Sequence, residues 1–389
     1  MTHGCPACSS AELEGFYELK SIPSNSCLLV EDVDEARAFP VGDVDLALCA
    51  RCGFITNRAF SSELAEYSSR YEETQAFSPR FVEFGHELAR TWVDRHELRD
   101  KHVLEIGCGK GEFLLWMLEA GVRSGTGIDP GVQPARLDPS LAHRVQWIRD
   151  RYDERYRDLE ADAVVCRHTL EHIAPVREFL RGLREHLEGT TTPVLFELPD
   201  TQRVLEEAAF WDVYYEHCSY FTSATLRSLF EHSGFEVERV ERVYEDQYLL
   251  IEAYPTQLPR NPVAEPGIVN DLRAAARRFS RDVDQLRARW RQRVAHLAQQ
   301  GSRIALWGGG SKAVAFLTTL GLGEEIGAVV DINPYKQGRF IAGTGHEVIA
   351  PDRLADLDPR LIIVMNPVYL DEVRADLDQL GIVAEVTAL

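Results

Sequence analysis

The sequence predicts an α/β protein with a small cysteine-rich domain, a central doubly wound domain and a second, smaller αβ domain at the C-terminus. Three observations predict this order: two matched cysteine pairs near the N-terminus, and two separate segments in which an apolar strand runs into a glycine-rich turn and an apolar helix. The chain has 389 residues, which corresponds to about two to four domains. The length therefore agrees with the predicted architecture.

Composition excludes several classes of protein. Lys and Arg total 42 against 62 Asp and Glu, and the formal charge of −20 argues against a nucleic-acid partner. A hydrophobic content of 45% excludes a wholly disordered chain. No apolar run is long enough to cross a membrane, and the first residues lack an apolar leader. We therefore expect a cytoplasmic protein, monomeric or homodimeric, that binds a small molecule and neither nucleic acid nor membrane.

Four of the eight cysteines form two C-x-x-C pairs, Cys5 with Cys8 and Cys49 with Cys52. Two such turns present four thiolates to one tetrahedral ion, which predicts a structural Zn²⁺ site with no open ligand position. Redox thiols are the alternative. We expect a small strand-rich insert between the pairs, and Gly53 supplies the left-handed backbone that such a turn often needs. The other cysteines are expected to be buried as small apolar side chains: Cys27, Cys108, Cys166 and Cys218.

Residues 101–150 contain the strongest pattern in the chain. An apolar strand at 103–106 is followed by a G-x-G-x-G turn, an apolar helix and a second strand that ends in an acid. Position 112 is Glu, so the turn departs from the G-x-G-x-x-G form that seats a pyrophosphate. Acids on both sides of the glycines suit S-adenosylmethionine (SAM), which has no phosphate to neutralise. The alternative is a decayed fold whose glycines only pack helix against strand. The predicted SAM-binding residues are Glu105, Gly107, Gly109, Gly111 and Asp129.

A further buried strand at 161–166 ends at Arg167 and His168, where residues of a doubly wound sheet line the ligand crevice. We expect both residues to contact the cofactor. His172 lies four positions after His168, but the sequence shows no third ligand beside them. A substrate-facing histidine is therefore expected at position 172 rather than a metal site.

The loop after the strand at 192–199 gathers acid–base groups, with Tyr214, Glu216 and His217 close together. A histidine beside a glutamate is suited to act as a general base near neutral pH, with Glu216 orienting or charging the ring of His217. The alternative is an aromatic loop that holds two elements together, with His217 only hydrogen-bonded.

The last third of the chain begins after a cluster of prolines, which marks a domain boundary: Pro255, Pro259, Pro262 and Pro266. An arginine-rich stretch at 268–300 contains interleaved aspartates and predicts a solvated connector helix. Its acidic surroundings argue against a nucleic-acid-binding helix.

A second strand–glycine–helix pattern follows, with Gly308-Gly-Gly-Ser-Lys312 after an apolar strand and Asp331 at the end of the next strand. This is not a P-loop, because Ser311 precedes Lys312. The domain either still binds a nucleotide or, as our main interpretation, has become a wall of the substrate cleft. Lys312 and Lys336 are the candidate contacts for a substrate phosphate.

In this order, the motifs resemble the three-domain C-methyltransferases of deoxysugar biosynthesis over nearly the whole chain. The resemblance implies an N-terminal zinc-binding domain, a central class I SAM methyltransferase domain with a Rossmann-like α/β fold, and a C-terminal Rossmann-like domain. The implied boundaries are residues 1–72 for the zinc-binding domain, 73–257 for the methyltransferase domain, 258–300 for a linker and connector helix, and 301–389 for the C-terminal domain.

The resemblance also implies a reaction, methylation at C-3 of a nucleotide-linked 4-keto sugar. It places the catalytic histidine at His217 with Glu216 and Tyr214 beside it, a second active-site histidine at His172, and a substrate-contacting tyrosine at Tyr71. His217 would remove a proton next to the ketone, and Tyr214 or His172 would donate to the developing enolate oxygen. An O- or N-methyltransferase of a small metabolite or glycan, and a non-catalytic SAM-binding scaffold, are the alternatives.

Overall fold

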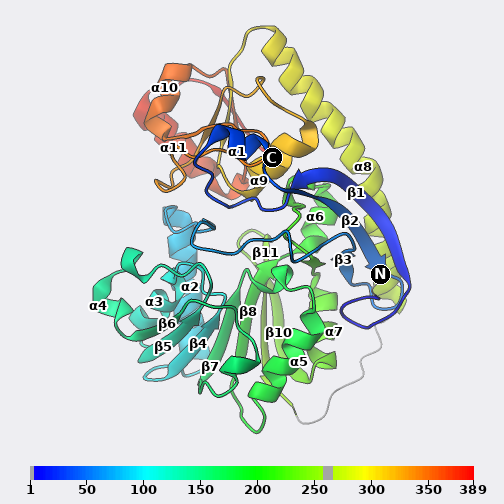
Figure 1. Ribbon diagram of the computed structural model, residues 1–389, viewed down its shortest axis with the longest axis vertical. Coiled ribbons are helices and arrows are strands. Elements are labelled where there is room, and N and C mark those ends of the chain that lie inside the picture. Colours follow the sequence, from blue (N-terminus) through cyan, green and yellow to red (C-terminus); the bar gives the residue numbers. More distant parts are fainter. Residues whose placement is uncertain (1–3, 257–265) are drawn as a thin grey trace.

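The computed structural model describes residues 4–256 and 266–389, whose strands form three separate sheets (Figure 1). A four-stranded sheet lies in the N-terminal region, a seven-stranded sheet occupies the middle of the chain, and a five-stranded sheet lies near the C-terminus. The two glycine-containing patterns fall on the seven-stranded and five-stranded sheets, as the sequence predicts.

The N-terminal sheet consists of antiparallel strands β1 (Leu13–Pro23), β2 (Val41–Cys49) and β3 (Ile55–Asn57), which confirms the strand-rich insert between the cysteine pairs. A short helix, α1 (Val33–Arg37), connects β1 to β2. The fourth strand, β9 (Ser219–Tyr220), comes from far along the chain and pairs with β3. The N-terminal sheet therefore holds one end of the loop that carries His217.

The central sheet has the order β10-β11-β8-β7-β4-β5-β6, with a parallel run from β8 to β6 and two antiparallel strands at one edge. The direction of strand succession reverses between β4 and β7, the point at which doubly wound sheets bind their ligands. The strands are β4 (His102–Ile106), β5 (Ser124–Ile128), β6 (Val145–Ile148), β7 (Ala163–Arg167), β8 (Val194–Pro199), β10 (Phe235–Val243) and β11 (Tyr248–Pro255).

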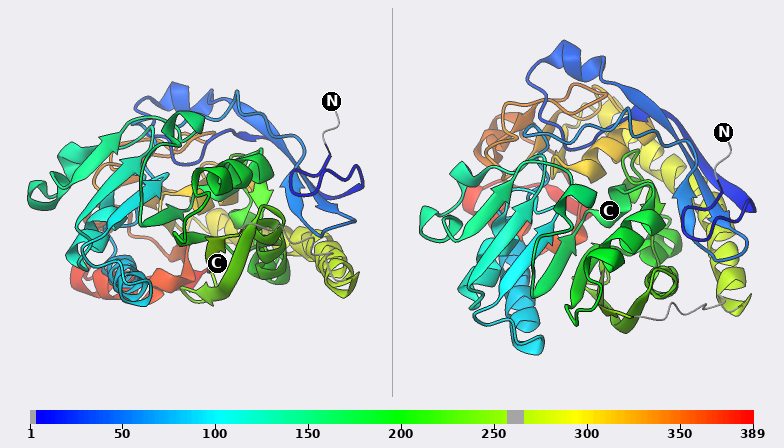
Figure 2. Two further views of the ribbon diagram at one scale, coloured as in Figure 1. Left: turned by 90° about the horizontal axis from the view of Figure 1, so that it is seen from below. Right: turned by 60° about the horizontal axis from the view of Figure 1, so that its bottom comes forward.

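Helices cover both faces of this sheet (Figure 2). Val103 packs in the apolar cluster that includes α2 and α3, whereas Leu104 packs in the cluster that includes α5 and α7. Consecutive residues of a strand point to opposite faces, so both faces of β4 are buried, and Val103 to Ile106 are apolar except for the buried Glu105. The helices are α2 (Pro79–Arg95), α3 (Glu112–Glu119), α4 (Pro139–Ala142), α5 (Val176–His186), α6 (Thr201–Glu207) and α7 (Ser223–His232).

The C-terminal sheet is entirely parallel, in the order β14-β13-β12-β15-β16. Its elements are β12 (Ile304–Trp307), α9 (Ser311–Leu320), β13 (Ala328–Val330), β14 (Val348–Ile349), α10 (Leu354–Leu357), β15 (Leu361–Val364), α11 (Leu370–Leu380) and β16 (Glu385–Ala388). The predicted second strand–glycine–helix pattern corresponds to β12 and α9.

Helix α8 (Pro266–Gln299) corrects the expectation of a solvated connector. One of its faces is buried, with Leu272, Phe279 and Trp290 in the same apolar cluster as residues of β1 and β12. The apolar positions recur every three or four residues among the arginines, so the helix is amphipathic and joins the N-terminal sheet to the C-terminal one. It runs beside β1 in Figure 1. The predicted linker with Pro259 and Pro262 lies outside the described residues.

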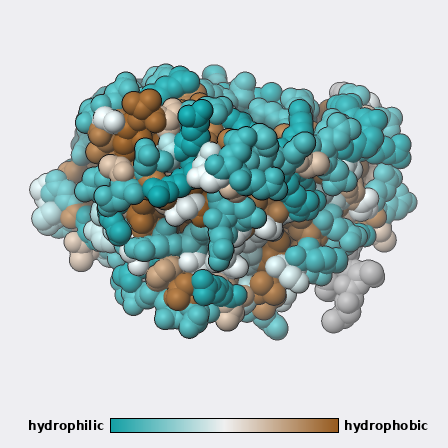
Figure 3. All heavy atoms as spheres, turned by 90° about the horizontal axis from the view of Figure 1, so that it is seen from above, coloured by the Kyte–Doolittle hydropathy of each residue, from teal (hydrophilic) through white to brown (hydrophobic). Residues whose placement is uncertain are grey.

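On the face shown in Figure 3, apolar residues form scattered patches among polar ones. Over residues 4–256 and 266–389, none of the helices combines the length and the apolarity that crossing a membrane requires.

Candidate functional site

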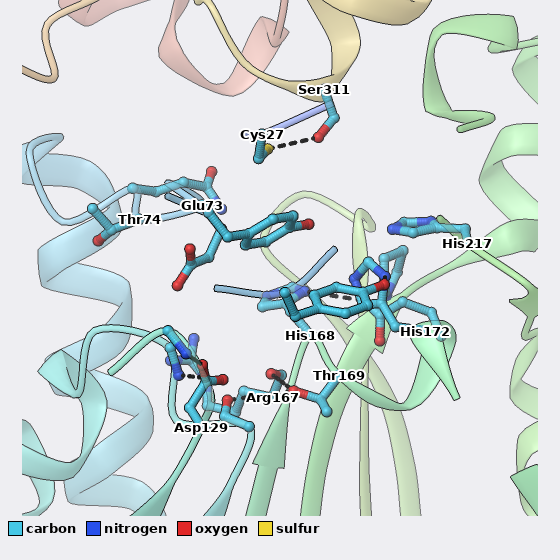
Figure 4. A pocket seen from close by; sticks show the side chains of 18 of the residues that line it. Cys27, Glu73, Thr74, Asp129, Arg167, His168, Thr169, His172, His217 and Ser311 are labelled. Carbon is cyan, nitrogen blue, oxygen red and sulfur yellow. Dashed lines mark hydrogen bonds and ion pairs between the residues drawn. The ribbon is translucent and has the colours of Figure 1, made fainter. Parts of the chain in front are cut away.

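A cavity of about 1130 Å³ is lined by residues that follow strands β4, β5 and β7 of the central sheet and β12, β13 and β15 of the C-terminal sheet. Figure 4 shows Cys27 and Ser311 on one side of it, Asp129 opposite, and His172 with His217 between these ends. Most of the predicted site residues lie in its wall; Gly111 and Glu216 do not. Those in the wall are Tyr71, Glu105, Gly107, Gly109, Asp129, Arg167, His168, His172, Tyr214, His217, Lys312 and Lys336.

The turn between β4 and α3 approaches the cavity through its backbone. Gly107 and Gly109 have φ angles of +68° and +53°, a region in which other side chains are strained. Asp129, which directly follows β5, accepts hydrogen bonds from the amides of Gly109 (3.1 Å) and Gly131 (2.6 Å). The carboxylate therefore fixes the turn while remaining part of the cavity wall. Gly111, with φ of +99°, is the N-cap of α3.

Carboxyl groups gather around this turn. Burial raises the pKa of Glu105 and of Glu73 to about 8, and Oε2 of Glu105 has no hydrogen-bond partner among the described residues. The nearby Lys110 is buried, lies 3.6 Å from Glu73 Oε2, and donates to the carbonyl oxygens of Tyr71 and Gly131. The ionised forms of these carboxyl groups favour a cationic ligand at this end of the cavity, where Lys110 is directed at backbone as well as at one acid.

Arg167 and His168 lie in the wall at the end of β7, and both are held by Glu197 of β8. Arg167 Nε donates to Glu197 Oε2 at 2.6 Å, and His168 Nε2 lies 3.0 Å from Oε1 of the same carboxylate. The guanidinium also stacks 4.1 Å from the ring centroid of Phe113. Burial opposes the charge of Glu197, but Arg167 and His168 outweigh it and hold its pKa at about 2. These contacts fix the two residues at the boundary between the glycine turn and the histidine pair.

His172 and His217 form an edge-to-face pair with ring centroids 4.8 Å apart. His172 Nδ1 lies 2.9 Å from the Tyr67 hydroxyl and 3.1 Å from the carbonyl oxygen of Glu216. Because a carbonyl only accepts, the contact with Glu216 is a hydrogen bond in the tautomer that carries the proton on Nδ1 and the lone pair on Nε2. Burial lowers the pKa of His172 to about 4 and lowers that of His217 well below its ordinary value, so both rings are neutral at pH 7.

The His217 ring has no hydrogen bond to any residue that the structure describes. It packs against the Tyr214 ring, with centroids 4.6 Å apart, and Tyr214 in turn donates its hydroxyl proton to Asp212 Oδ1 at 2.9 Å. A neutral imidazole that lies in a cavity wall without a protein partner is free to accept a proton from a bound molecule.

Glu216 does not orient His217, contrary to the sequence-based expectation. Its carboxylate accepts from the Ser26 amide at 2.9 Å and from the Ser26 hydroxyl. Ser26 Oγ also lies 2.7 Å from Ser311 Oγ, which lies 3.1 Å from Cys27 Sγ. The glutamate therefore contacts the segment between β1 and α1, and Ser26 of that segment in turn contacts the first residue of α9.

The C-terminal side of the cavity carries lysines. Lys312 forms an ion pair with Asp212, which also accepts from Arg203 at 2.5 Å. Lys336 lies 3.4 Å from Asp331, and Asp331 accepts from the Gly309 amide at 2.8 Å. Burial alone would favour neutral Lys336, but Asp331 outweighs it and raises the pKa of the ammonium. Burial lowers the pKa of Lys312 in spite of Asp212. This end of the cavity therefore carries two lysines, each paired with an aspartate.

The four predicted metal-ligating cysteines meet at the edge of the N-terminal sheet, away from the cavity. Cys5 Sγ lies 3.6 Å from Cys52 Sγ, and Cys8 Sγ lies 3.6 Å from Cys49 Sγ. All four sulfur atoms are within 4.8 Å of one another. Tetrahedral zinc with bonds of about 2.3 Å requires sulfur atoms about 3.8 Å apart, so the four side chains fit one such ion. Gly53 has φ of +74°, as predicted for this turn.

Several residues in the wall were not found from the sequence. Cys27 was expected to be an ordinary buried side chain but lines the cavity beside Ser311. Cys108, Cys166 and Cys218 are buried as expected, and Cys108 also borders the cavity. Tyr67 and Glu73 also line the cavity. Tyr67 is close to His172 and Glu73 to the glycine turn, and neither belongs to a motif that a single sequence reveals.

Two protein-family models match the chain: a methyltransferase domain over residues 78–240 and a C-methyltransferase C-terminal domain over residues 268–382. The chain is 26% identical over 365 residues to the C-methyltransferase NovU of Streptomyces niveus, covering 89% of this chain and 85% of that protein. It is 36% identical over 85 residues to the ribosomal protein L11 methyltransferase of Haemophilus influenzae, 20% of this chain and 28% of that one.

Among solved structures, the fold is similar to that of the 1,6-didemethyltoxoflavin-N1-methyltransferase of Burkholderia thailandensis. That match has a TM-score of 0.35 and 20% identity, and covers 46% of this chain and 82% of the other.

Proposed function

This chain belongs to the SAM-dependent C-methyltransferases, and on that premise we propose that it methylates a carbon next to a ketone, at C-3 of a nucleotide-linked 4-keto sugar. We assign cofactor binding to residues 73–257, closure of the substrate side to residues 301–389 and metal binding to residues 1–72. The single observation that carries the proposal is His217, a neutral and unpartnered base between an acidic and a basic end of one cavity.

The acidic end fits the cofactor. Asp129, Glu105 and the backbone of the glycine turn would hold SAM, whose sulfonium and ammonium groups are cationic. When bound, SAM supplies an electrophilic methyl group. The cavity of about 1130 Å³ exceeds the 300–1,000 Å³ typical of a pocket for one ligand, which leaves room for a second molecule.

The basic end fits the nucleotide phosphates of the acceptor. Lys336 and Lys312 lie at the turn before α9, and Tyr71 lies in the wall between this turn and the histidines. An acceptor held by its phosphates there would extend its sugar ring toward His217. A nucleotide-linked sugar therefore matches the charge distribution better than a cationic or fully apolar acceptor does.

His217 would take the proton next to the ketone, because carbon becomes nucleophilic only after this proton is lost. Its lowered pKa keeps the lone pair available at pH 7. His172 cannot donate to the enolate oxygen from Nε2, since its proton lies on Nδ1. Tyr214 is then the donor: its hydroxyl would turn from Asp212 to the enolate oxygen, and Lys312 and Arg203 would still balance the aspartate.

We assign structural Zn²⁺ to Cys5, Cys8, Cys49 and Cys52. Four protein ligands leave no open position, so the ion would hold the N-terminal sheet rather than take part in catalysis. Zinc analysis of the purified protein should find one ion per chain, and Cys49→Ser should lose it together with cooperative unfolding of the N-terminal region. A full complement of zinc in that variant would refute the assignment.

The acceptor is tested by a screen of dTDP-, GDP- and CDP-linked keto sugars with isotope-labelled SAM, read by mass spectrometry and NMR. The proposal expects a labelled methyl group on a ring carbon next to the ketone. A label on oxygen or nitrogen would show the alternative reaction, and no transfer to any member, with intact SAM binding, would favour a non-catalytic role.

A further inference from the structure

Glu171, His172 and His217 converge on one spot in the cavity wall, with ligand atoms that all lie within 4.8 Å of one another. Figure 4 shows the two histidine side chains close together at the side of the cavity. We propose that these three residues form a second metal site, for a divalent transition-metal ion such as Zn²⁺, and that an ion bound there blocks methyl transfer.

Two of the three groups have an atom without a hydrogen-bond partner in the part of the chain that the structure describes: Glu171 is buried, with its Oε1 3.8 Å from His168 Nδ1, and His217 is partly exposed to the cavity. Glu171 is 2% exposed, and its Oε2 has no hydrogen-bond partner among the described residues. The His217 ring makes no hydrogen bond within residues 4–256 and 266–389 either. Buried polar groups are nearly always paired, so the open Glu171 Oε2 beside an imidazole that faces the cavity requires an explanation. A bound cation would satisfy both.

His172 already has the arrangement of a metal ligand. Its Nδ1 is held at 3.1 Å by the backbone carbonyl of Glu216 and at 2.9 Å by the Tyr67 hydroxyl. Metal-binding histidines almost always donate their second ring nitrogen in this way, which fixes the ring and directs the other lone pair to the ion. Here that lone pair is on Nε2.

The donor set selects the class of ion. Two imidazoles and one carboxylate suit Zn²⁺, Co²⁺, Ni²⁺ and similar ions, whereas Mg²⁺ and Ca²⁺ prefer oxygen ligands alone. Three protein ligands leave at least one coordination position open to the cavity, unlike the closed site of four cysteines. The two metal sites therefore differ in their ligands, in their access to the cavity and in how readily a bound ion exchanges.

Inhibition follows from the lone pair of His217, and this part rests on the proposed function. A metal ion and the substrate proton would compete for the same nitrogen, so an occupied site has no base. Binding of the ion itself does not depend on which acceptor the enzyme uses.

The binding arm uses full-length protein that already contains one Zn²⁺ per chain, titrated with Co²⁺ without substrate. We expect one further equivalent, with the visible bands of a nitrogen–oxygen site and no sulfur-to-cobalt charge transfer. Glu171→Gln should weaken this binding by at least about 100-fold, and Tyr67→Phe by about 10-fold, as for loss of an outer-shell partner. Glu178→Gln, an exposed cavity acid outside the cluster, is the matched control and should bind as the wild type does.

Failure of Co²⁺ to bind beyond the first site, or binding that neither Glu171→Gln nor Tyr67→Phe weakens, would overturn the site.

The second arm measures methyl transfer with added Zn²⁺. We expect inhibition that a mild chelator reverses while the first zinc stays bound, and that Glu178→Gln shares with the wild type. Co²⁺ binding without inhibition would overturn only the competition with His217, and activation by the ion would do the same. An inactive enzyme that binds Co²⁺ normally would instead count against the proposed function.

Discussion

The two parallel sheets that meet at the cavity are built alike but present opposite charge to it. In the central sheet, Asp129 follows the second strand and accepts from the Gly109 amide at 3.1 Å. In the C-terminal sheet, Asp331 occupies the same place and accepts from the Gly309 amide at 2.8 Å. The chain therefore contains the same unit twice, a strand, a glycine turn, a helix and an acid after the next strand. The backbone geometry alone does not distinguish which ligand each unit binds.

The difference lies in where the lysines point. Lys110 of the first turn also lines the cavity, but its ammonium donates to backbone carbonyl oxygens and lies 3.6 Å from only one of the carboxyl groups in the wall, that of Glu73. Lys312 and Lys336 of the second unit lie in the cavity wall and pair with single aspartates. The same unit thus serves a cationic or an anionic ligand according to which charges its side chains bring to the cavity.

The largest effect is expected at the junction of the two units. His217→Asn should lower kcat by about 10²- to 10⁴-fold, the usual contribution of a general base, and leave the Kd for SAM unchanged. Steady-state kinetics and calorimetry measure the two quantities. A variant with near-normal kcat would remove His217 from the chemistry.

Asp129 and Asp331 test directly whether the two units bind different ligands. Asp129→Asn should raise the KM for SAM by about 10- to 100-fold, since hydrogen bonds to charged groups contribute about 1.5–3 kcal/mol, and should leave the KM for the acceptor almost unchanged. Asp331→Asn should do the reverse. Each variant is the control for the other, because in both a carboxylate that accepts from two backbone amides loses its charge and one of its two acceptor oxygens. If both raised the same KM, the two units would not have separate ligands.

Glu105 tests whether negative charge at the cofactor end of the cavity attracts SAM. Burial raises its pKa to about 8, so it is mostly neutral at pH 7 and ionised at pH 9. Its negative form attracts SAM, and Glu105→Gln should therefore match wild-type affinity at pH 7 and fall behind by up to about 10-fold at pH 9. Titration of SAM itself affects the wild type and the variant equally, so it does not change the ratio of their affinities for SAM. A ratio that does not change with pH would show that Glu105 does not face the cofactor.

The smallest effect is expected in the decrease of kcat as the pH is lowered. Burial lowers the pKa of His217, and the neighbouring His172 adds to the shift. A base must be neutral, so activity is lost only as pH falls through this lowered pKa, and kcat should change by less than about twofold between pH 8 and 6. A pH–rate profile with its acid limb centred at 6.5 or above would contradict the buried environment of His217.

The sequence predicts the sheets well because their signals are local. The runs at 103–106 and 161–166 are mostly apolar, each with a single acid, and they contribute most of β4 and β7 in the middle of a sheet buried on both faces. The positions of Gly107, Asp129 and Gly308 follow from the same local pattern. The sequence also predicts helix α8 but not its buried face, because arginines are interleaved with the apolar residues that form that face.

The contacts that complete the site were beyond sequence reasoning because they join distant segments. Ser26 and Ser311 are 285 positions apart, and Ser26 and Glu216 are 190 apart. Neither serine belongs to a motif for the contact it makes. The expectation that Glu216 orients His217 came from their adjacency, and it is wrong because Ser26, in the segment between β1 and α1, binds the carboxylate.

The central claim is that His217 makes a carbanion next to a ketone before the methyl group is transferred. Exchange in D₂O tests it most directly, with the accepted keto sugar, S-adenosylhomocysteine in the cofactor end and no SAM. NMR should show deuterium entering the methylated position with the wild-type enzyme and no exchange above background with His217→Asn. Equal exchange with both proteins, or methylation by the wild type at a carbon that never exchanges, would contradict the account.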